Sequence, residues 1–171
     1  AVKKMPKVTV IIPSYNHAKF IGEAIQSVLD QTFQDFEVLI RDDGSKDNSI
    51  EVIKQFTDSR IKFAANPHNM GACYTVNTMI EEASGEYIAL LNSDDVWVLD
   101  KLEKQVKFLE ENPQYMAVFA NAVMIDGSSK IMKNTLGLYH SFSDPKNTNI
   151  DWLKRFMLIQ NNIFHPTVLI R

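Results

Sequence analysis

Hydrophobic and polar positions alternate along the first half of the chain in blocks that predict strands and helices in turn. Short runs rich in apolar and β-branched residues predict strands over residues 8–12, 36–40 and 87–91. A shorter strand is predicted over residues 60–64. Between these runs, apolar residues recur at the spacing of an amphipathic helix; the predicted helices cover 20–29, 48–56 and 72–83. This alternation predicts an α/β fold with a Rossmann-like, mostly parallel sheet and helices on both faces.

The second half of the chain is less regular. The pattern predicts a helix, a strand, a long polar loop, a second helix and a final strand, over residues 99–111, 117–123, 128–149, 150–159 and 167–170. Long loops of this kind are often functional. Because the last predicted strand ends at Arg171, we expect the C-terminal part to be truncated, with the sequence cut from a longer protein.

Polar clusters follow several predicted strands, at the point where each strand ends. These clusters are Ser14-Tyr15-Asn16, Asp42-Asp43-Gly44-Ser45 and Asn92-Ser93-Asp94-Asp95. In open α/β sheets, ligands bind beyond the carboxyl ends of the strands. The pattern therefore predicts that the clusters meet in a single site.

Composition narrows the ligands that such a site can take. The chain has 171 residues, 45% of them hydrophobic, which suits one globular domain. Its net charge of −3 argues against a nucleic-acid-binding protein, which needs a surplus of Lys and Arg. A small anionic ligand remains compatible, because a metal ion can supply positive charge locally. Cys73 is the only cysteine, which fits a reducing compartment.

Paired carboxylates are the strongest chemical signal in the sequence. Neither a P-loop nor a dinucleotide-binding glycine fingerprint is present, so a phosphate ligand needs another anchor. Adjacent carboxylates provide one by holding Mg²⁺ or Mn²⁺. Asp94 and Asp95 follow the most apolar strand, where an ionised pair is costly unless a cation offsets it. Capping of a following helix by Ser93 or Asp94 is the alternative, and the position beyond a central strand favours a metal.

Asp43 and Tyr15 each allow a functional and a structural interpretation. The segment Asp42-Asp43-Gly44-Ser45 is typical of turns, but a carboxylate there could accept a hydrogen bond from an N–H of a nucleobase. Tyr15 could stack on that base, or pack against a neighbouring helix. Taken singly, the residues leave both alternatives open.

Taken together, several segments in order resemble family 2 inverting glycosyltransferases of the GT-A fold. The resemblance covers roughly residues 7–125 and rests on many motifs with consistent spacing, which makes it specific. The matching segments are Val10-Ile11-Ile12-Pro13-Ser14-Tyr15-Asn16, Ser27-Val28-Leu29-Asp30-Gln31-Thr32-Phe33, Glu37-Val38-Leu39-Ile40-Arg41-Asp42-Asp43-Gly44-Ser45, Asn69-Met70-Gly71, Gly85-Glu86-Tyr87-Ile88-Ala89-Leu90-Leu91, Ser93-Asp94-Asp95 and Leu99-Asp100-Lys101-Leu102-Glu103-Lys104-Gln105.

The resemblance implies a role for each candidate residue. Pro13 and Tyr15 would line the uracil pocket, and Asp43 would bond the base. Asp94 would lie near the ribose and diphosphate, and Asp95 would be the main ligand of Mn²⁺ or Mg²⁺. The ion would neutralise the departing nucleoside diphosphate. An acceptor hydroxyl would attack the anomeric carbon with inversion, helped by a carboxylate as general base.

The same resemblance implies a single GT-A domain over residues 1–171, of which about 7–98 form the nucleotide-binding half. Residues 99–171 would begin the acceptor half without completing it. The family's general base follows a strand that resembles 165–171, so we expect the base beyond Arg171 and assign none here. We therefore expect the chain to bind its donor and to transfer poorly.

The expected partners are a nucleotide-sugar donor, a UDP-sugar, and a carbohydrate, lipid-linked or protein acceptor in polysaccharide biosynthesis. No apolar stretch is long enough for a membrane span, and the run 8–12 is too short for a signal peptide. The expected location is the cytoplasm, with peripheral attachment to the inner face of the membrane as an option.

Two other interpretations remain. A sugar-phosphate nucleotidylyltransferase would need a glycine-rich, basic loop after the first strand, and Ser14-Tyr15-Asn16-His17 is neither. A binding or assembly module would keep the donor site without a general base. Donor binding without transfer or hydrolysis would distinguish that module from an enzyme.

Overall fold

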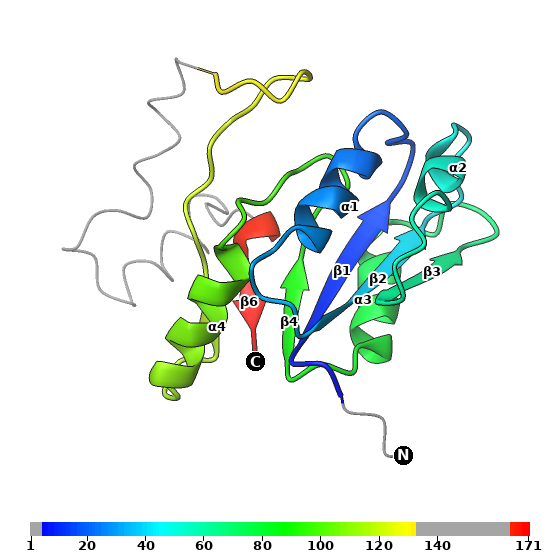
Figure 1. Ribbon diagram of the computed structural model, residues 1–171. Coiled ribbons are helices and arrows are strands. Elements are labelled where there is room, and N and C mark those ends of the chain that lie inside the picture. Colours follow the sequence, from blue (N-terminus) through cyan, green and yellow to red (C-terminus); the bar gives the residue numbers. More distant parts are fainter. Residues whose placement is uncertain (1–4, 133–164) are drawn as a thin grey trace, which may run out of the picture.

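A six-stranded sheet with the order β3-β2-β1-β4-β6-β5 forms the centre of the molecule (Figure 1). The structure, a computed structural model, describes residues 5–132 and 165–171. β1 pairs in parallel with β2 and β4, and β2 with β3, whereas β6 runs antiparallel to β4 and β5. The predicted mostly parallel α/β sheet is therefore confirmed. The strands are β1 (Val8–Ser14), β2 (Phe36–Asp42), β3 (Ile61–Ala65), β4 (Tyr87–Leu90), β5 (Ala117–Val118) and β6 (Leu169–Ile170).

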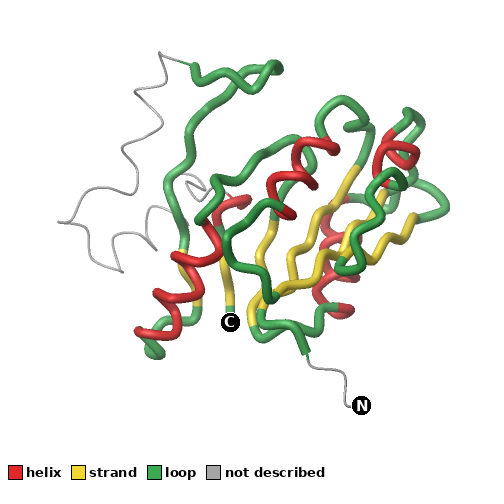
Figure 2. Tube along the Cα trace, in the orientation of Figure 1, coloured by secondary structure: helices red, strands yellow, loops and turns green. Residues whose placement is uncertain are grey.

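Helices cover both faces of this sheet, as predicted (Figure 2). α1 (Ile21–Leu29), α2 (Ser49–Ile53) and α4 (Lys101–Glu111) pack on one face, and α3 (Ala72–Glu82) packs on the other. Alternate residues of a strand point to opposite faces, so Val10 and Ile12 join the larger core while Ile11 contacts the α3 side. Among the described residues, no helix has the length and hydropathy needed to cross a membrane.

Several boundaries in the second half differ from the predicted ones. The strand predicted over 117–123 ends at Val118, because β6 offers only Leu169 and Ile170 as pairing partners. Thr167, the first residue of the strand predicted over 167–170, instead belongs to the preceding turn, η1 (His165–Thr167). α4 begins two residues later than predicted because the Leu99 carbonyl accepts the Thr32 N–H instead. The helix predicted over 150–159 lies outside the described residues.

A buried carboxylate, Glu37, ties the strands together near their amino ends. Its Oε1 accepts hydrogen bonds from Thr9 Oγ1 at 2.8 Å and from Ser84 Oγ at 2.7 Å. Its Oε2 lies 2.6 Å from Lys62 Nζ. Burial raises the pKa of Glu37, but the hydrogen bonds from Lys62, Ser84 and Thr9 outweigh burial and lower that pKa to about 2. The charged form is thus the one that stabilises the fold.

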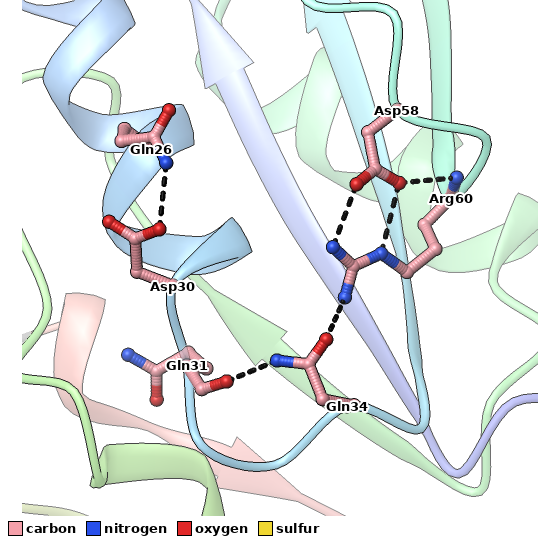
Figure 3. A network of polar contacts seen from close by, with 6 residues as sticks. All are labelled: Gln26, Asp30, Gln31, Gln34, Asp58 and Arg60. Atoms are coloured by element: carbon pink, nitrogen blue, oxygen red, sulfur yellow. Dashed lines mark hydrogen bonds and ion pairs between the residues drawn. The ribbon is translucent and has the colours of Figure 1, made fainter.

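A second polar network braces the loop between α1 and β2 (Figure 3). Arg60 donates from Nε to Asp58 Oδ1 at 2.9 Å and from Nη2 to Asp58 Oδ2 at 2.7 Å. Its Nη1 donates to Gln34 Oε1 at 2.7 Å, and Gln34 donates onward to the Gln31 carbonyl. The guanidinium also lies 4.4 Å from the Phe36 ring centroid. These contacts stabilise the sheet at the amino ends of β2 and β3. The candidate site residues lie at the opposite, carboxyl ends of the strands.

We expect Glu37→Gln to lower the free energy of unfolding at pH 7 by about 1–3 kcal/mol, because Lys62 then loses its charged partner. The folded-state pKa of about 2 lies below the ordinary value of 4.5. The stabilisation is therefore present above about pH 4.5 and is lost as pH falls towards 2. Urea unfolding of both proteins at pH 7 and at about pH 3 measures the difference, which should shrink at the lower pH.

Glu81→Gln on the exposed surface of α3 is the matched control and should change stability by less than about 0.5 kcal/mol. Equal destabilisation by the two substitutions, or a difference independent of pH, would contradict the role assigned to Glu37.

Candidate functional site

The loops at the carboxyl ends of β1 and β2 are joined by hydrogen bonds. Ser14 Oγ donates to Asp42 Oδ2 at 3.2 Å, and the Asn16 N–H donates to Ser45 Oγ at 2.8 Å. The Ala18 N–H donates to Oδ2 of Asp47, which follows the second cluster, at 3.0 Å. The first two polar clusters of the sequence therefore meet at one edge of the sheet.

His17 connects these loops to the third cluster, after β4. Its backbone N–H donates to Ser49 Oγ at 3.0 Å, and its ring Nδ1 lies 2.7 Å from Ser93 Oγ. Its carbonyl accepts the N–H groups of Phe20 and Ile21, where α1 begins. His17 was not predicted as a site residue from the sequence. Its position directly after Asn16, the last residue of the first polar cluster, could have indicated it.

Asp43 is buried, and its carboxylate holds the loop of residues 66–71. Oδ1 accepts hydrogen bonds from Asn66 Nδ2 at 2.7 Å and from the Met70 N–H at 2.8 Å, and Oδ2 accepts the Gly71 N–H at 2.9 Å. Burial raises the pKa of Asp43, but the bonds from Met70, Asn66 and Gly71 outweigh it and lower that pKa. The carboxylate is thus charged and largely satisfied by the protein. Its predicted bond to a nucleobase stays a prediction.

Gly44 allows the same loop to approach the end of β2. Its φ of +74° is in the region that favours glycine. A Cβ at this position would lie 2.6 Å from the backbone carbonyl carbon of His68. The glycine of the Asp-Asp-Gly-Ser segment is therefore required by close packing as well as by the turn.

Pro13 and Tyr15 lie at the end of β1, on either side of Ser14, whose carbonyl accepts the Asp43 N–H at 2.8 Å. Pro13 is half-buried and aligns with Arg41 of β2 in the strand register. Tyr15 is 38% exposed, so part of its ring is available to a ligand. The structure brings both residues to the same sheet edge as Asp43.

Asp94 and Asp95 differ in their surroundings. Asp94 is exposed, whereas Asp95 is half-buried and accepts a hydrogen bond from Asn92 Nδ2 at 2.9 Å. Burial raises the pKa of Asp95, with a smaller contribution from Asp94, and the Asn92 and His17 side chains only partly oppose it. A carboxylate in this position gains stability from a nearby cation. The helix-capping alternative fails, because α4 begins at Lys101 and Ser93 contacts His17 instead.

The side chains at this edge suit a metal that arrives with its ligand. Within the described ranges, no group of at least three His, Cys, Asp or Glu side chains converges to hold an ion. Mg²⁺ bound with a nucleotide needs only one or two carboxylates, because phosphate oxygens and water complete its coordination. Asp95 therefore fits a metal–diphosphate complex and does not fit a permanent structural metal.

Two hollows adjoin the carboxylate pair. One, of about 200 Å³, is lined by Asp94, Glu23 and Asp126 among others. The other, of about 340 Å³, is lined by Asp95, Trp97, Lys101 and the segment 120–123. Space for a ligand thus continues from the strand ends towards the second half of the chain.

Comparison with known proteins agrees with this arrangement. The model of the glycosyl transferase family 2 matches residues 9–170. A UDP-Glc:alpha-D-GlcNAc-diphosphoundecaprenol beta-1,3-glucosyltransferase, WfgD of Escherichia coli, is 41% identical over 127 residues, which cover 74% of this chain and 49% of that protein. The chain spans about half, or somewhat less, of the length of the first such relatives, at 49%, 44% and 43%.

Solved structures give the same fold. S. aureus TarS 1–349 in complex with UDP-GlcNAc has a TM-score of 0.60 and 29% identity, over 63% of this chain and 32% of that one. The mannosyltransferase PcManGT from Pyrobaculum calidifontis, in complex with GDP-Man and Mn2+, has a TM-score of 0.62 and 26% identity, over 72% of this chain and 37% of that one. The predicted GT-A fold is therefore confirmed. The chain belongs to glycosyl transferase family 2.

Proposed function

We propose that this chain is the donor-binding part of an inverting, metal-assisted glycosyltransferase that uses a UDP-sugar. The observation that carries the proposal is the convergence of Tyr15, Asp43 and Asp95 at one sheet edge. The name of the E. coli relative specifies UDP-Glc as its donor, and the TarS structure contains UDP-GlcNAc. PcManGT binds GDP-Man, so guanine is the alternative base to be tested.

The hydrogen bonds of Asp43 favour uracil over guanine. Asn66, Met70 and Gly71 donate to the Asp43 carboxylate, and a hydrogen bond from the Thr75 side chain also lowers its pKa. Because a carboxylate offers about four lone-pair sites, Asp43 has little acceptor capacity left for a ligand. The single N–H of a uracil ring makes the smaller demand on it, whereas the corresponding edge of guanine carries an N–H and an amino group. Tyr15 would stack on the base, with Pro13 beside it.

Asp95 would hold the Mn²⁺ or Mg²⁺ ion, with Asp94 near the ribose and diphosphate. The bound ion would supply positive charge that offsets the negative charge developing on the departing nucleoside diphosphate. The chain's own contribution is to orient Asp95. Asn92 holds its Oδ2 at 2.9 Å, and His17 fixes the neighbouring Ser93 through the 2.7 Å contact. Such partners restrict how a metal-binding carboxylate can move.

Attack by the acceptor hydroxyl with inversion requires a general base on the face opposite the leaving group. None of the described residues is assigned to this role, so donor binding and transfer are to be measured separately. A lipid-linked acceptor is favoured because the name of the E. coli relative specifies a diphosphoundecaprenol-linked sugar. Work on such an acceptor would take place at the cytoplasmic face of a membrane. A module that binds donor without turnover remains the alternative, and a transfer assay distinguishes it.

Calorimetric titration of UDP, with and without Mn²⁺, tests the proposed donor site. We expect Mn²⁺ to strengthen UDP binding by roughly tenfold or more, and Asp95→Ala to remove that gain. UDP should bind more tightly than GDP, because the uracil edge presents one N–H to the nearly saturated Asp43 carboxylate and the guanine edge presents more donors. Glu81→Ala, at an exposed position on α3, is the control and should behave as the wild type.

Failure of the folded protein to bind UDP under any condition would contradict the uridine assignment. Unchanged Mn²⁺ dependence in Asp95→Ala would show that another residue binds the metal.

Substitution of Gly44 by Ala should push the 66–71 loop away from Asp43. A Cβ there would meet the His68 carbonyl carbon at 2.6 Å, whereas a Cβ on Gly71, with a φ of +92°, would have nothing within 4 Å. Both substitutions strain the backbone, but only Gly44→Ala adds a clash. We expect Gly44→Ala to cost about 1–3 kcal/mol more stability than Gly71→Ala.

Hydrogen exchange gives the local measurement for this comparison. The Met70 and Gly71 amides, which donate to Asp43, should exchange faster in Gly44→Ala, and UDP affinity should fall with them. If Gly44→Ala and Gly71→Ala have the same stability and exchange rates, close packing at Gly44 is not what holds the loop.

A further inference from the structure

A buried lysine lines the cavity of about 340 Å³ beside Asp95. Lys101, the first residue of α4, is only 7% exposed. Its Nζ donates to Gln105 Oε1 at 2.7 Å and lies 3.9 Å from the centroid of the Trp97 ring. Across the residues described by the structure, it makes no ion pair with a carboxylate. Lys101 thus lines the cavity, and its ammonium contacts two neutral partners, Gln105 and Trp97.

The other lysines of α4 show the usual arrangement. Lys104 and Lys107 are exposed, and each pairs with a carboxylate, at 2.6 Å from Asp100, which directly precedes α4, and at 3.9 Å from Glu111 at its end. Lys101 has neither solvent nor a carboxylate. A buried ammonium without a counter-ion is costly, and burial alone lowers the pKa of Lys101 to about 7. An anionic ligand would remove that cost.

Neighbouring hydrogen bonds hold the wall around Lys101 in place. Gln105 Nε2 donates to the Thr167 carbonyl at 2.7 Å, and Trp97 Nε1 donates to the Pro166 carbonyl at 2.7 Å. Both contacts join α4 and its preceding loop to η1. The ammonium is therefore positioned in advance, which is typical of a binding group.

The carboxylates that line the cavity do not neutralise Lys101. Glu23 Oε2 accepts a hydrogen bond from Ser129 Oγ at 2.6 Å. Asp95 is bonded by Asn92 and is the proposed metal ligand. Much of the remaining wall is apolar, including Val96 and Ile125. An apolar cavity with a few fixed polar groups is the usual form of a small-molecule site.

We propose that the Lys101 ammonium binds an oxyanion, a phosphate or carboxylate carried by the sugar substrate, in this cavity. Its 340 Å³ is at the low end of the roughly 300–1,000 Å³ of ligand pockets, so it suits one sugar-sized group rather than a whole nucleotide sugar. The cavity begins at Asp95 and extends towards η1 and residues 120–131. Tyr15 and Asp43, the proposed base-binding residues, are not part of its lining. Assigning the anion to a substrate of the transfer reaction rests on the proposed function.

Side-chain NMR of lysine tests the proposal with nucleotide-free probes. Glucose 1-phosphate, glucuronate and neutral methyl glucoside are titrated into the protein, labelled at lysine Cε, and Lys101→Met identifies the Lys101 signal. We expect glucose 1-phosphate or glucuronate to shift that signal and methyl glucoside to leave it unchanged. A response to the phosphate alone assigns the anion to a sugar phosphate, and a response to glucuronate alone assigns it to a uronic acid.

Affinities of the variants separate a binding role from a structural one. Lys101→Met should fold, because replacing a buried charge by an apolar side chain is often neutral or stabilising, and it should weaken anion binding by roughly tenfold or more. Lys101→Arg should retain binding, and Lys104→Met, on the same helix, should match the wild type. UDP–Mn²⁺ affinity is measured on the same variants: Lys104→Met should match the wild type, and Lys101→Met should lose more affinity for the anion than for UDP–Mn²⁺.

Equal anion affinity in Lys101→Met and wild type would overturn the proposal, as would a Lys101 signal that no anion shifts. Neither result depends on UDP binding, so failure of the donor site and failure of the Lys101 site are distinguishable.

Discussion

Two buried carboxylates at the end of β2 hold the site together. Asp42 accepts hydrogen bonds from Ser14 of the β1 end and from the backbone N–H and hydroxyl of Ser45. Asp43 accepts those of the 66–71 loop. Buried charges are tolerated only when they are well bonded, and bonds to an ionised acceptor are stronger than neutral ones. The loops on either side of β2 are thereby fixed in one arrangement before any ligand binds.

Asp43 and Asp95 lie at the same sheet edge but differ in their electrostatic surroundings. Asp43 is satisfied by protein donors and has a lowered pKa, whereas Asp95 is half-buried with a raised pKa. Asp43 is therefore held in place by the protein itself, whereas Asp95 gains stability when a cation binds nearby. Beyond Asp95, the adjoining cavity is lined by Lys101, the proposed anion-binding residue. This order of charges suits a ligand with a neutral base, a metal-bound diphosphate and an anionic group further along.

The sequence was sufficient for the sheet and for the convergence of the polar clusters. Strands such as 8–12 and 36–40 are mostly apolar, with one polar residue each, and parallel strands bring their carboxyl ends to one edge. The same rule could not give the length of β5, because that depends on how few residues of β6 can pair with it. Nor could it show that Asp94 is exposed and Asp95 half-buried, because burial depends on which residues distant in sequence pack nearby.

His17 and Lys101 escaped the sequence analysis for different reasons. A single histidine in a polar segment has no spacing pattern, and its contact with Ser93 joins residues far apart in sequence. Lys101 did leave a signal. Together with Gln105 and Leu109 it follows the four-residue spacing of one helix face, and all are buried. A lysine on the inward side of an amphipathic helix is a sign of a buried charge that needs a partner.

A crystal structure of the protein with UDP and Mn²⁺ would most directly test whether Asp43 binds the base and Asp95 binds the metal. We expect Mn²⁺ bound by a carboxylate oxygen of Asp95 and by the diphosphate, with the uracil ring against Tyr15 and its N–H directed at Asp43. Manganese on other carboxylates, or a uracil ring away from Tyr15 and Asp43, would contradict the proposed donor site.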